Sequence, residues 1–187
     1  IANTPAYSCP SASVLTLTDV SDSVGQNTVR DAINALRGFG GTAGHIGLAW
    51  GWYLVSPSWT GIFPAASQPK PYDKDKVIKV IVLMTDGMFN TSYRNGGQYY
   101  VWPDASTGDP LKPGTSCYQA LKICENIRNL DGQLQIYTVG FQTPPEAEAL
   151  LKECAGAANF INVDSAAQLS VAFKKIANKL TMLRVSG

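Results

Sequence analysis

The chain has 187 residues, of which 45% are hydrophobic and 16% are charged, and its formal net charge is +1. This length suits one domain of ordinary size. The balanced charge, with no basic block, excludes the usual footprint of a nucleic-acid-binding protein. No apolar run reaches the length of a membrane span.

Helical and strand patterns alternate along the chain. A short strand is expected first, then a helix capped by Asn27 or Thr28, then an almost wholly apolar helix. The aliphatic run 80–83, closed by Thr85-Asp86-Gly87, is typical of a central strand buried on both faces. In chain order, the expected elements are a strand at 14–18, helices at 27–37 and 42–54, a strand at 80–83, a helix at 115–130, a strand at 134–141, a helix at 145–154, a strand at 160–163 and a helix at 166–183, with long loops at 56–75 and 90–114. This order predicts an α/β fold with a mostly parallel sheet and helices on both faces.

Asp86 is the strongest candidate for a functional residue, because it stands where a buried strand ends. Open α/β sheets place their ligand sites at the carboxyl ends of strands. The carboxylate can ligate a hard cation such as Mg²⁺, or it can cap the turn through its own backbone. Thr42 follows Gly40-Gly41 and opens a helix. Its hydroxyl is predicted to be either the helix N-cap, which the pattern alone favours, or a metal ligand.

Two further features have a structural and a functional interpretation. The run Asp19-Val20-Ser21-Asp22-Ser23 offers closely spaced oxygens that suit a divalent cation, but Asp and Ser are also what ordinary turns use, and we favour the turn. His45 is the single histidine, and it lies on an apolar helix in a chain without a G-x-S-x-G motif. It is therefore predicted to be packed and hydrogen-bonded rather than catalytic.

Four segments resemble the von Willebrand factor A (vWA) domain, and most of all its version in TadG-like proteins of bacterial Tad (Flp) pilus assembly. The segments are GGTAGHIGLAWGWYLVSP (40–57), VIVLMTDGMFN (80–90), IYTVGFQ (136–142) and LSVAFKKIANKLTMLRVSG (169–187). The resemblance implies one vWA-like domain over residues 1–187, with a Rossmann-like sheet flanked by helices.

The resemblance also implies a metal site. The family builds a metal ion-dependent adhesion site (MIDAS) from a D-x-S-x-S motif after its first strand, a threonine after a glycine pair, and an aspartate at the end of a later strand. Thr42 matches the second element and Asp86 the third, which makes them the expected ligands of Mg²⁺ or Mn²⁺. The loops 56–75 and 90–114 are expected to surround this site.

Asp19, Ser21 and Ser23 match the first element letter for letter, but we interpret this match as coincidental. Only one helix separates them from Gly40, whereas the family has further strands there. The first strands and the true first motif are then missing. The chain, which has no initiating methionine, is expected to be a carboxyl-terminal fragment that exposes a sheet edge.

The cysteines gain a role from the same resemblance. TadG-like proteins carry an N-terminal membrane anchor, expected here to lie outside this chain, and their vWA domain is on the extracytoplasmic side, where disulfides persist. The family resemblance pairs Cys124 with Cys154. Cys117 lies two helical turns before Cys124 and cannot bridge it within a regular helix. Cys9 is left to pair with Cys117 or with a residue upstream of this chain.

The implied function is a non-enzymatic protein–protein interaction or adhesion module of the bacterial cell envelope, acting in Tad pilus assembly. Its expected partner is a pilus or envelope protein whose carboxylate completes the coordination of the cation. The alternative is a metal-dependent hydrolase that uses Asp86. The single histidine, the lack of a P-loop and the lack of an Asp-x-Asp arrangement at the strand end argue against it.

Overall fold

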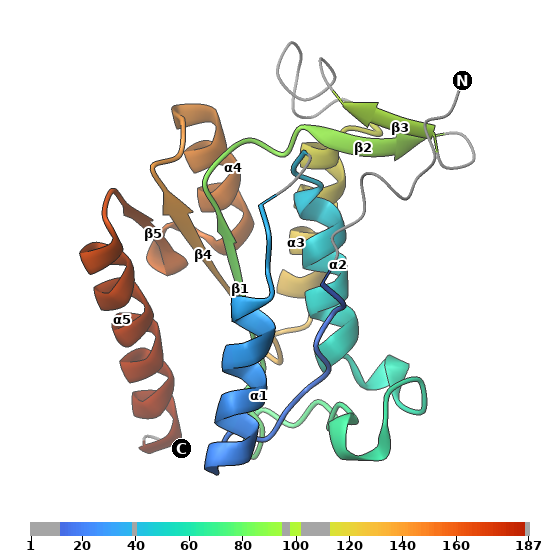
Figure 1. Ribbon diagram of the computed structural model, residues 1–187, viewed down its shortest axis with the longest axis vertical. Helices are drawn as coiled ribbons and strands as arrows, with labels where there is room; N and C mark the ends of the chain where they lie inside the picture. Colours follow the sequence, from blue (N-terminus) through green and yellow to red (C-terminus); the bar gives the residue numbers. More distant parts are fainter. Residues whose placement is uncertain (1–11, 39–40, 95–97, 102–112, 186–187) are drawn as a thin grey trace.

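The computed structural model of the protein describes residues 12–38, 41–94, 98–101 and 113–185. From α2 onward helices alternate with strands, except that a pair of strands, β2 and β3, comes between β1 and α3 (Figure 1). The longer elements are α1 (Ser23–Asn34), α2 (Gly44–Val55), β1 (Val80–Thr85), β2 (Thr91–Arg94), β3 (Gln98–Val101), α3 (Ser116–Arg128), β4 (Gln135–Phe141), α4 (Pro145–Ala155), β5 (Phe160–Val163) and α5 (Ala166–Val185). Short 3-10 turns occur at Pro57–Trp59, Ala65–Ser67 and Ala157–Asn159.

The main sheet is parallel and has three strands in the order β1-β4-β5. Val80 lies opposite Gln135 at the start of β1, and Thr85 lies opposite Gly140 at its end. Helices pack on both faces of this sheet. The molecule is therefore a mixed α/β protein, as the alternating sequence pattern predicts.

Alternation of side chains along β4 divides the core into two clusters. Ile136 points to the face that α2, α3 and α4 cover, where it packs with Leu48, Cys124 and other buried residues. Tyr137 and Val139 point to the opposite face, which α5 covers through Ala172 and Ile176. β4 is the central strand, and all of its residues from Ile136 to Gly140 are buried.

The prediction that β1 is a central strand buried on both faces is wrong. β1 stands at the edge of the sheet. Ile81 is buried against the helical layer, but Val82 and Met84 on the other face are 37% and 43% exposed. The physical reason is that α5 packs over β4 and β5 and leaves most of β1 uncovered.

Three other expectations need correction. Residues 14–18 form no strand. α1 begins at Ser23 rather than at residue 27, because the Asp22 carboxylate accepts a hydrogen bond from the Gly25 N–H and so caps the helix earlier than expected. The expected loop 90–114 contains the antiparallel pair β2–β3, in which Thr91 lies opposite Val101.

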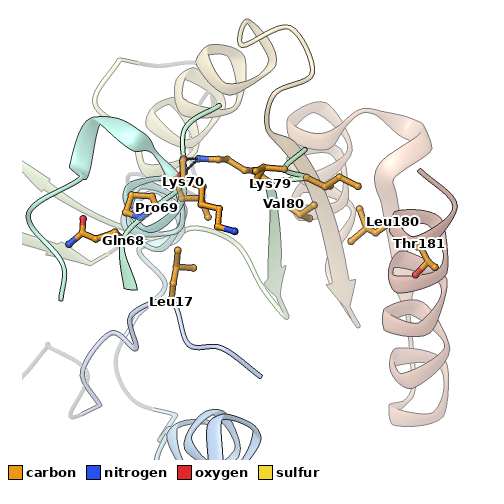
Figure 2. Close-up of a pocket in the computed structure, with 11 residues that line it drawn as sticks. Leu17, Gln68, Pro69, Lys70, Lys79, Val80, Leu180 and Thr181 are labelled. Carbon is orange, nitrogen blue, oxygen red and sulfur yellow. Dashed lines mark hydrogen bonds between the residues drawn. The ribbon is translucent and has the colours of Figure 1, made fainter. Parts of the chain in front are cut away.

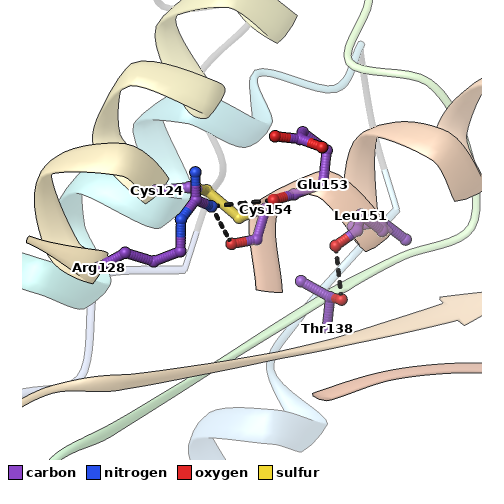
Figure 3. The surroundings of a disulfide bond; sticks show 6 residues. All are labelled: Cys124, Arg128, Thr138, Leu151, Glu153 and Cys154. Carbon is purple, nitrogen blue, oxygen red and sulfur yellow. Dashed lines mark hydrogen bonds between the residues drawn. A yellow bond between two sulfur atoms is a disulfide. The ribbon is translucent and has the colours of Figure 1, made fainter. Parts of the chain in front are cut away.

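A disulfide joins Cys124 in α3 to Cys154 in α4, as the family resemblance implies. Figure 3 shows the contacts around it. The Arg128 guanidinium reaches across from α3 and donates to the carbonyl oxygens of Glu153 (2.9 Å) and Cys154 (2.7 Å) at the end of α4. The Thr138 hydroxyl of β4 donates to the Leu151 carbonyl at 2.9 Å. Together these bonds attach α4 to both the helical layer and the sheet.

The free thiol of Cys117 is buried, and Cys9 lies outside the described residues. Among the described helices, none combines the length and the apolarity that crossing a bilayer requires.

Candidate functional site

The candidate site lies at the carboxyl end of β1, where the segment before α2 meets the segment after Asp86. The Thr42 N–H donates to Asn90 Oδ1 at 2.7 Å. In return, the Asn90 and Thr91 N–H groups donate to the Thr42 carbonyl at 3.0 and 3.2 Å. These three bonds bring residues far apart in the sequence together at the rim of the sheet.

Two glycines allow this close approach. A Cβ atom on Gly41 would lie 2.2 Å from Thr91 Oγ1, and one on Gly44 would lie 2.1 Å from the Phe89 ring. Real Cβ atoms do not approach other atoms so closely, and Phe89 is fully buried. The glycines around Thr42 therefore serve to seat this segment on residues 89–91.

Asp86 is exposed and does not close its own turn. The neighbouring Thr85 does so: its hydroxyl donates to the Gly87 carbonyl at 3.0 Å and accepts from the Gly87 N–H at 3.2 Å. The interpretation of Asp86 as a turn cap is thus wrong. Its carboxylate remains available to a ligand.

Thr42 is half-buried, and it does not cap α2. The helix begins at Gly44 after an N-cap at Ala43, with no side-chain hydrogen bond to the cap. The capping interpretation that spacing favoured is therefore also wrong. Thr42 is held by its backbone, which leaves its hydroxyl without a partner among the described residues.

The structure does not bring Asp19, Ser21 and Ser23 to this rim. The neighbouring Leu17 lines a cavity with Val80, at the amino end of β1. Asp19 Oδ1 accepts from the Ser21 N–H at 2.8 Å, and this hydrogen bond lowers the pKa of the Asp19 carboxyl. This is the ordinary turn chemistry that the sequence analysis favoured.

His45 is packed in the interior, as expected. Its Nδ1 is 2.6 Å from the Ser116 hydroxyl at the start of α3, and burial lowers the pKa of the imidazole. Next to Ser116, the Cys117 thiol donates to the Phe89 carbonyl at 3.7 Å, and burial raises its pKa. These contacts fasten α2 and α3 beneath the rim.

The donors at the rim suit a hard cation. Mg²⁺ prefers carboxylate, hydroxyl and water oxygens and is often held by only one or two carboxylates. Asp86 supplies a carboxylate and Thr42 a hydroxyl. Within the described residues, no three His, Cys, Asp or Glu side chains gather into a metal-binding group. Any cation at this rim would therefore depend on hydroxyls and waters as well as on Asp86.

Sequence reasoning missed Asn90. Its side-chain oxygen accepts from the Thr42 N–H and, at 3.0 Å, from the Thr91 hydroxyl, which makes it the link between the two segments. The signal in the sequence that could have pointed to Asn90 was its place at the end of the VIVLMTDGMFN motif.

The expected loop at 56–75 does not surround the rim. α2 runs opposite to β1, so this loop begins at the amino end of the strand, where Lys79 donates to the Val55 carbonyl at 2.6 Å.

Comparison with protein-family models gave no match, and no curated protein matches the chain.

Proposed function

We propose that this chain is a vWA-type, non-enzymatic protein–protein interaction module that binds a divalent cation at the carboxyl rim of its sheet. The proposed setting is the extracytoplasmic side of the bacterial cell envelope, in Tad pilus assembly. That setting rests on the TadG-like segments alone. The cation site rests on the residues of the rim.

The observation that carries the proposal is the hydrogen-bonded junction between Thr42 and Asn90. It holds the threonine of one motif against Asn90 and Thr91, which follow the aspartate of the other motif by four and five positions. Neither side chain has the local structural role that the sequence offered for it. Thr85, not Asp86, closes the turn after β1, and Thr42 does not cap α2.

Such a site binds its partner through the metal. Thr42 and Asp86 hold the cation directly or through water, and a position left open accepts a carboxylate from an Asp or Glu of the partner. Asn90 acts as a positioning residue, because it fixes the backbone of Thr42. The partner is a pilus or envelope protein. Nucleic acid is not part of this proposal.

The test is calorimetric titration of Mg²⁺ and Mn²⁺ into the chain and into D86A and T42A. D75A serves as the matched control, because Asp75 is an exposed aspartate in the loop 73–76. We expect D86A to abolish binding, T42A to weaken it and D75A to leave it unchanged. Absence of binding by the unaltered chain would overturn the metal-dependent mechanism, and equal binding by all four proteins would place the cation elsewhere.

The same proteins also test the alternative. We expect no hydrolysis of phosphate or carboxylate esters with either metal present. Turnover that D86A abolishes and D75A preserves would identify a hydrolase instead.

A further inference from the structure

The loop after α2 carries apolar side chains and no charge. Arg37 is the last charged residue before it and Lys70 the first after it, and the one histidine between them is buried. At residues 59–63, here called the apolar turn, Trp59 and Phe63 are half-buried and Ile62 is 69% exposed. Apolar groups that gather at the surface mark a site of interaction.

Aromatic contacts seat the apolar turn on α2. The Trp59 ring stacks on Tyr53 of α2, with ring centres 4.0 Å apart and 21° between the planes. Trp50, earlier in the same helix, meets Tyr53 edge-on at 5.8 Å. Gly61 has a φ of 91° and turns the chain just before Ile62. The structure therefore holds the exposed isoleucine in a fixed turn.

The apolar turn bonds its own backbone N–H groups. Those of Trp59, Thr60 and Ile62 each donate to the carbonyl three positions earlier, at 3.1, 3.1 and 3.2 Å. The Gly61 N–H donates to Gln68 Oε1 at 2.6 Å. Four consecutive N–H groups thus have protein partners and need no water.

The Gln68 side chain closes the other side of the turn. Its Nε2 donates to the Phe63 carbonyl and, at 3.3 Å, to the Pro64 carbonyl. Figure 2 shows the Gln68 amide turned away from Leu17 and from the cavity at the amino end of β1. A backbone that is already bonded can leave water at little cost, whereas unbonded groups oppose burial in an apolar medium.

The apolar turn lies at the end of the molecule opposite the metal rim. α2 runs opposite to β1, and Figure 1 shows the loop beyond the end of α2, at the other end from the hairpin β2–β3. Strands added beside β1 widen the sheet, whereas the turn projects past the amino end of that strand. A wider sheet therefore leaves the turn at the surface.

We propose that the apolar turn inserts into the surface of a phospholipid bilayer. Ile62 and Phe63 enter the outer acyl region, and the Trp59 indole lies at the level of the headgroups, where such rings are favoured. The contact is weak and reversible, with half-maximal binding at about millimolar lipid, since a turn of this size buries less apolar surface than one acyl chain. It directs the metal rim away from the membrane. The inference stands whether or not a cation binds at that rim.

The chemistry of the turn favours a lipid surface over a protein partner. Protein interfaces use hydrogen bonds and paired charges to fix their register. The apolar turn offers neither, because its N–H groups are already bonded and residues 38–69 carry no charged side chain apart from the buried histidine. A fluid acyl layer needs neither and accepts a projecting apolar turn.

The probe is vesicles of phosphatidylcholine, alone or mixed in equal parts with phosphatidylglycerol, and binding is measured by co-sedimentation. I62D is matched by V171D, because Val171 on the outer surface of α5 is 65% exposed. We expect I62D to weaken binding by about tenfold or more and V171D to leave it unchanged. Equal binding by the two variants, or no binding of the unaltered chain at several millimolar lipid, would overturn the proposal.

Salt separates insertion from electrostatic adsorption. Because the turn is uncharged, we expect both kinds of vesicle to bind, and binding to persist in about 1 M salt, where the Debye length is about 3 Å. Binding to the anionic vesicles alone, lost in high salt, would show adsorption through charges elsewhere on the protein and would overturn the proposal.

Tryptophan fluorescence locates the contact in a variant that keeps the turn apolar. I62W places an indole at the exposed position, and V171W places one on α5. We expect vesicles with brominated acyl chains to quench I62W more than the unaltered chain, and V171W no more than the unaltered chain. Equal quenching of the two variants would contradict insertion at the turn. This result does not depend on the folding of I62D.

Light scattering without lipid addresses a second copy of the chain as the occupant. We expect a monomer at the concentrations of the binding experiment. A concentration-dependent dimer that I62D abolishes and V171D preserves would show that the turn packs against another copy, and would overturn the proposal.

Discussion

Gly44 shows how one missing side chain holds the candidate site together. A Cβ atom there would lie 2.1 Å from the buried Phe89 ring, whereas one on Gly47, a turn later in the same helix, would meet nothing within 4 Å. We expect G44A to lower the free energy of unfolding by about 1–3 kcal/mol, because the ring has no room to move. G47A should raise it by about 0.5–1 kcal/mol through helix propensity. Urea unfolding measures both, and equal effects would show that the Phe89 contact is not tight.

The burial of His45 predicts that the stability of the protein depends on pH. Burial lowers its pKa in the folded protein, whereas the unfolded chain takes up a proton near the ordinary value of about 6.5. The unfolded state therefore binds more protons as the pH falls below that value, and stability falls with it until the lowered pKa is reached. The slope from this group is at most about 1.4 kcal/mol per pH unit. Urea unfolding at a series of pH values should show a weaker dependence in H45Q, and identical profiles would contradict the assignment.

At the scale of elements, α4 depends on its attachment to α3. The disulfide closes a loop with a sequence separation of 30 between Cys124 and Cys154. Loops of this length are stabilised by about 3–4 kcal/mol in the chain-entropy account. Replacing both cysteines by alanine should lower the free energy of unfolding by about that amount. Adding a reductant should destabilise the unaltered chain and leave the double variant unchanged. A variant that stays sensitive to reductant would point to a different bond.

The elements also show what periodicity can and cannot predict. α3, β4, α4 and α5 lie close to their expected ranges, since each has a strong apolar pattern and clear end signals such as Thr115, Asp131-Gly132 and Ser165. The hairpin β2–β3 was missed because each of its strands has only four residues, and they lie in a segment rich in Gly, Asp and Pro that is typical of a loop. At the site, Thr42 and Asp86 follow from motifs. Asn90 does not, because it acts through a bond to a backbone 48 positions away.

At the scale of the whole molecule, the sequence predicts apolar faces but not whether anything covers them. The sequence through α1 and just beyond it carries Val29, Ile33 and Leu36 at helical spacing, a pattern much like that of α3. α3 buries Cys117, Ala120, Cys124 and Ile127, whereas Ile33 and Leu36 in and after α1 are exposed, and α1 makes few contacts with any other helix or strand. β1 shows the same mismatch, with an interior composition at an open edge. Exposed apolar residues thus occur from residue 14 through α1, on the edge strand β1 and on the outer surface of α5, whereas the buried core lies around β4.

This uneven distribution predicts different effects for the same substitution in two helices. Ile33 of α1 is 60% exposed and Ile127 of α3 is 0% exposed. I127A removes a core side chain and should cost about 2–5 kcal/mol of unfolding free energy. I33A should change it by no more than about 0.5 kcal/mol. The two helices should also differ in amide hydrogen exchange, with α1 exchanging through local opening and α3 only through global unfolding. A large cost for I33A in the isolated chain, with α1 as protected as α3, would mean that α1 packs against the sheet in solution and that the apolar surface described here is covered.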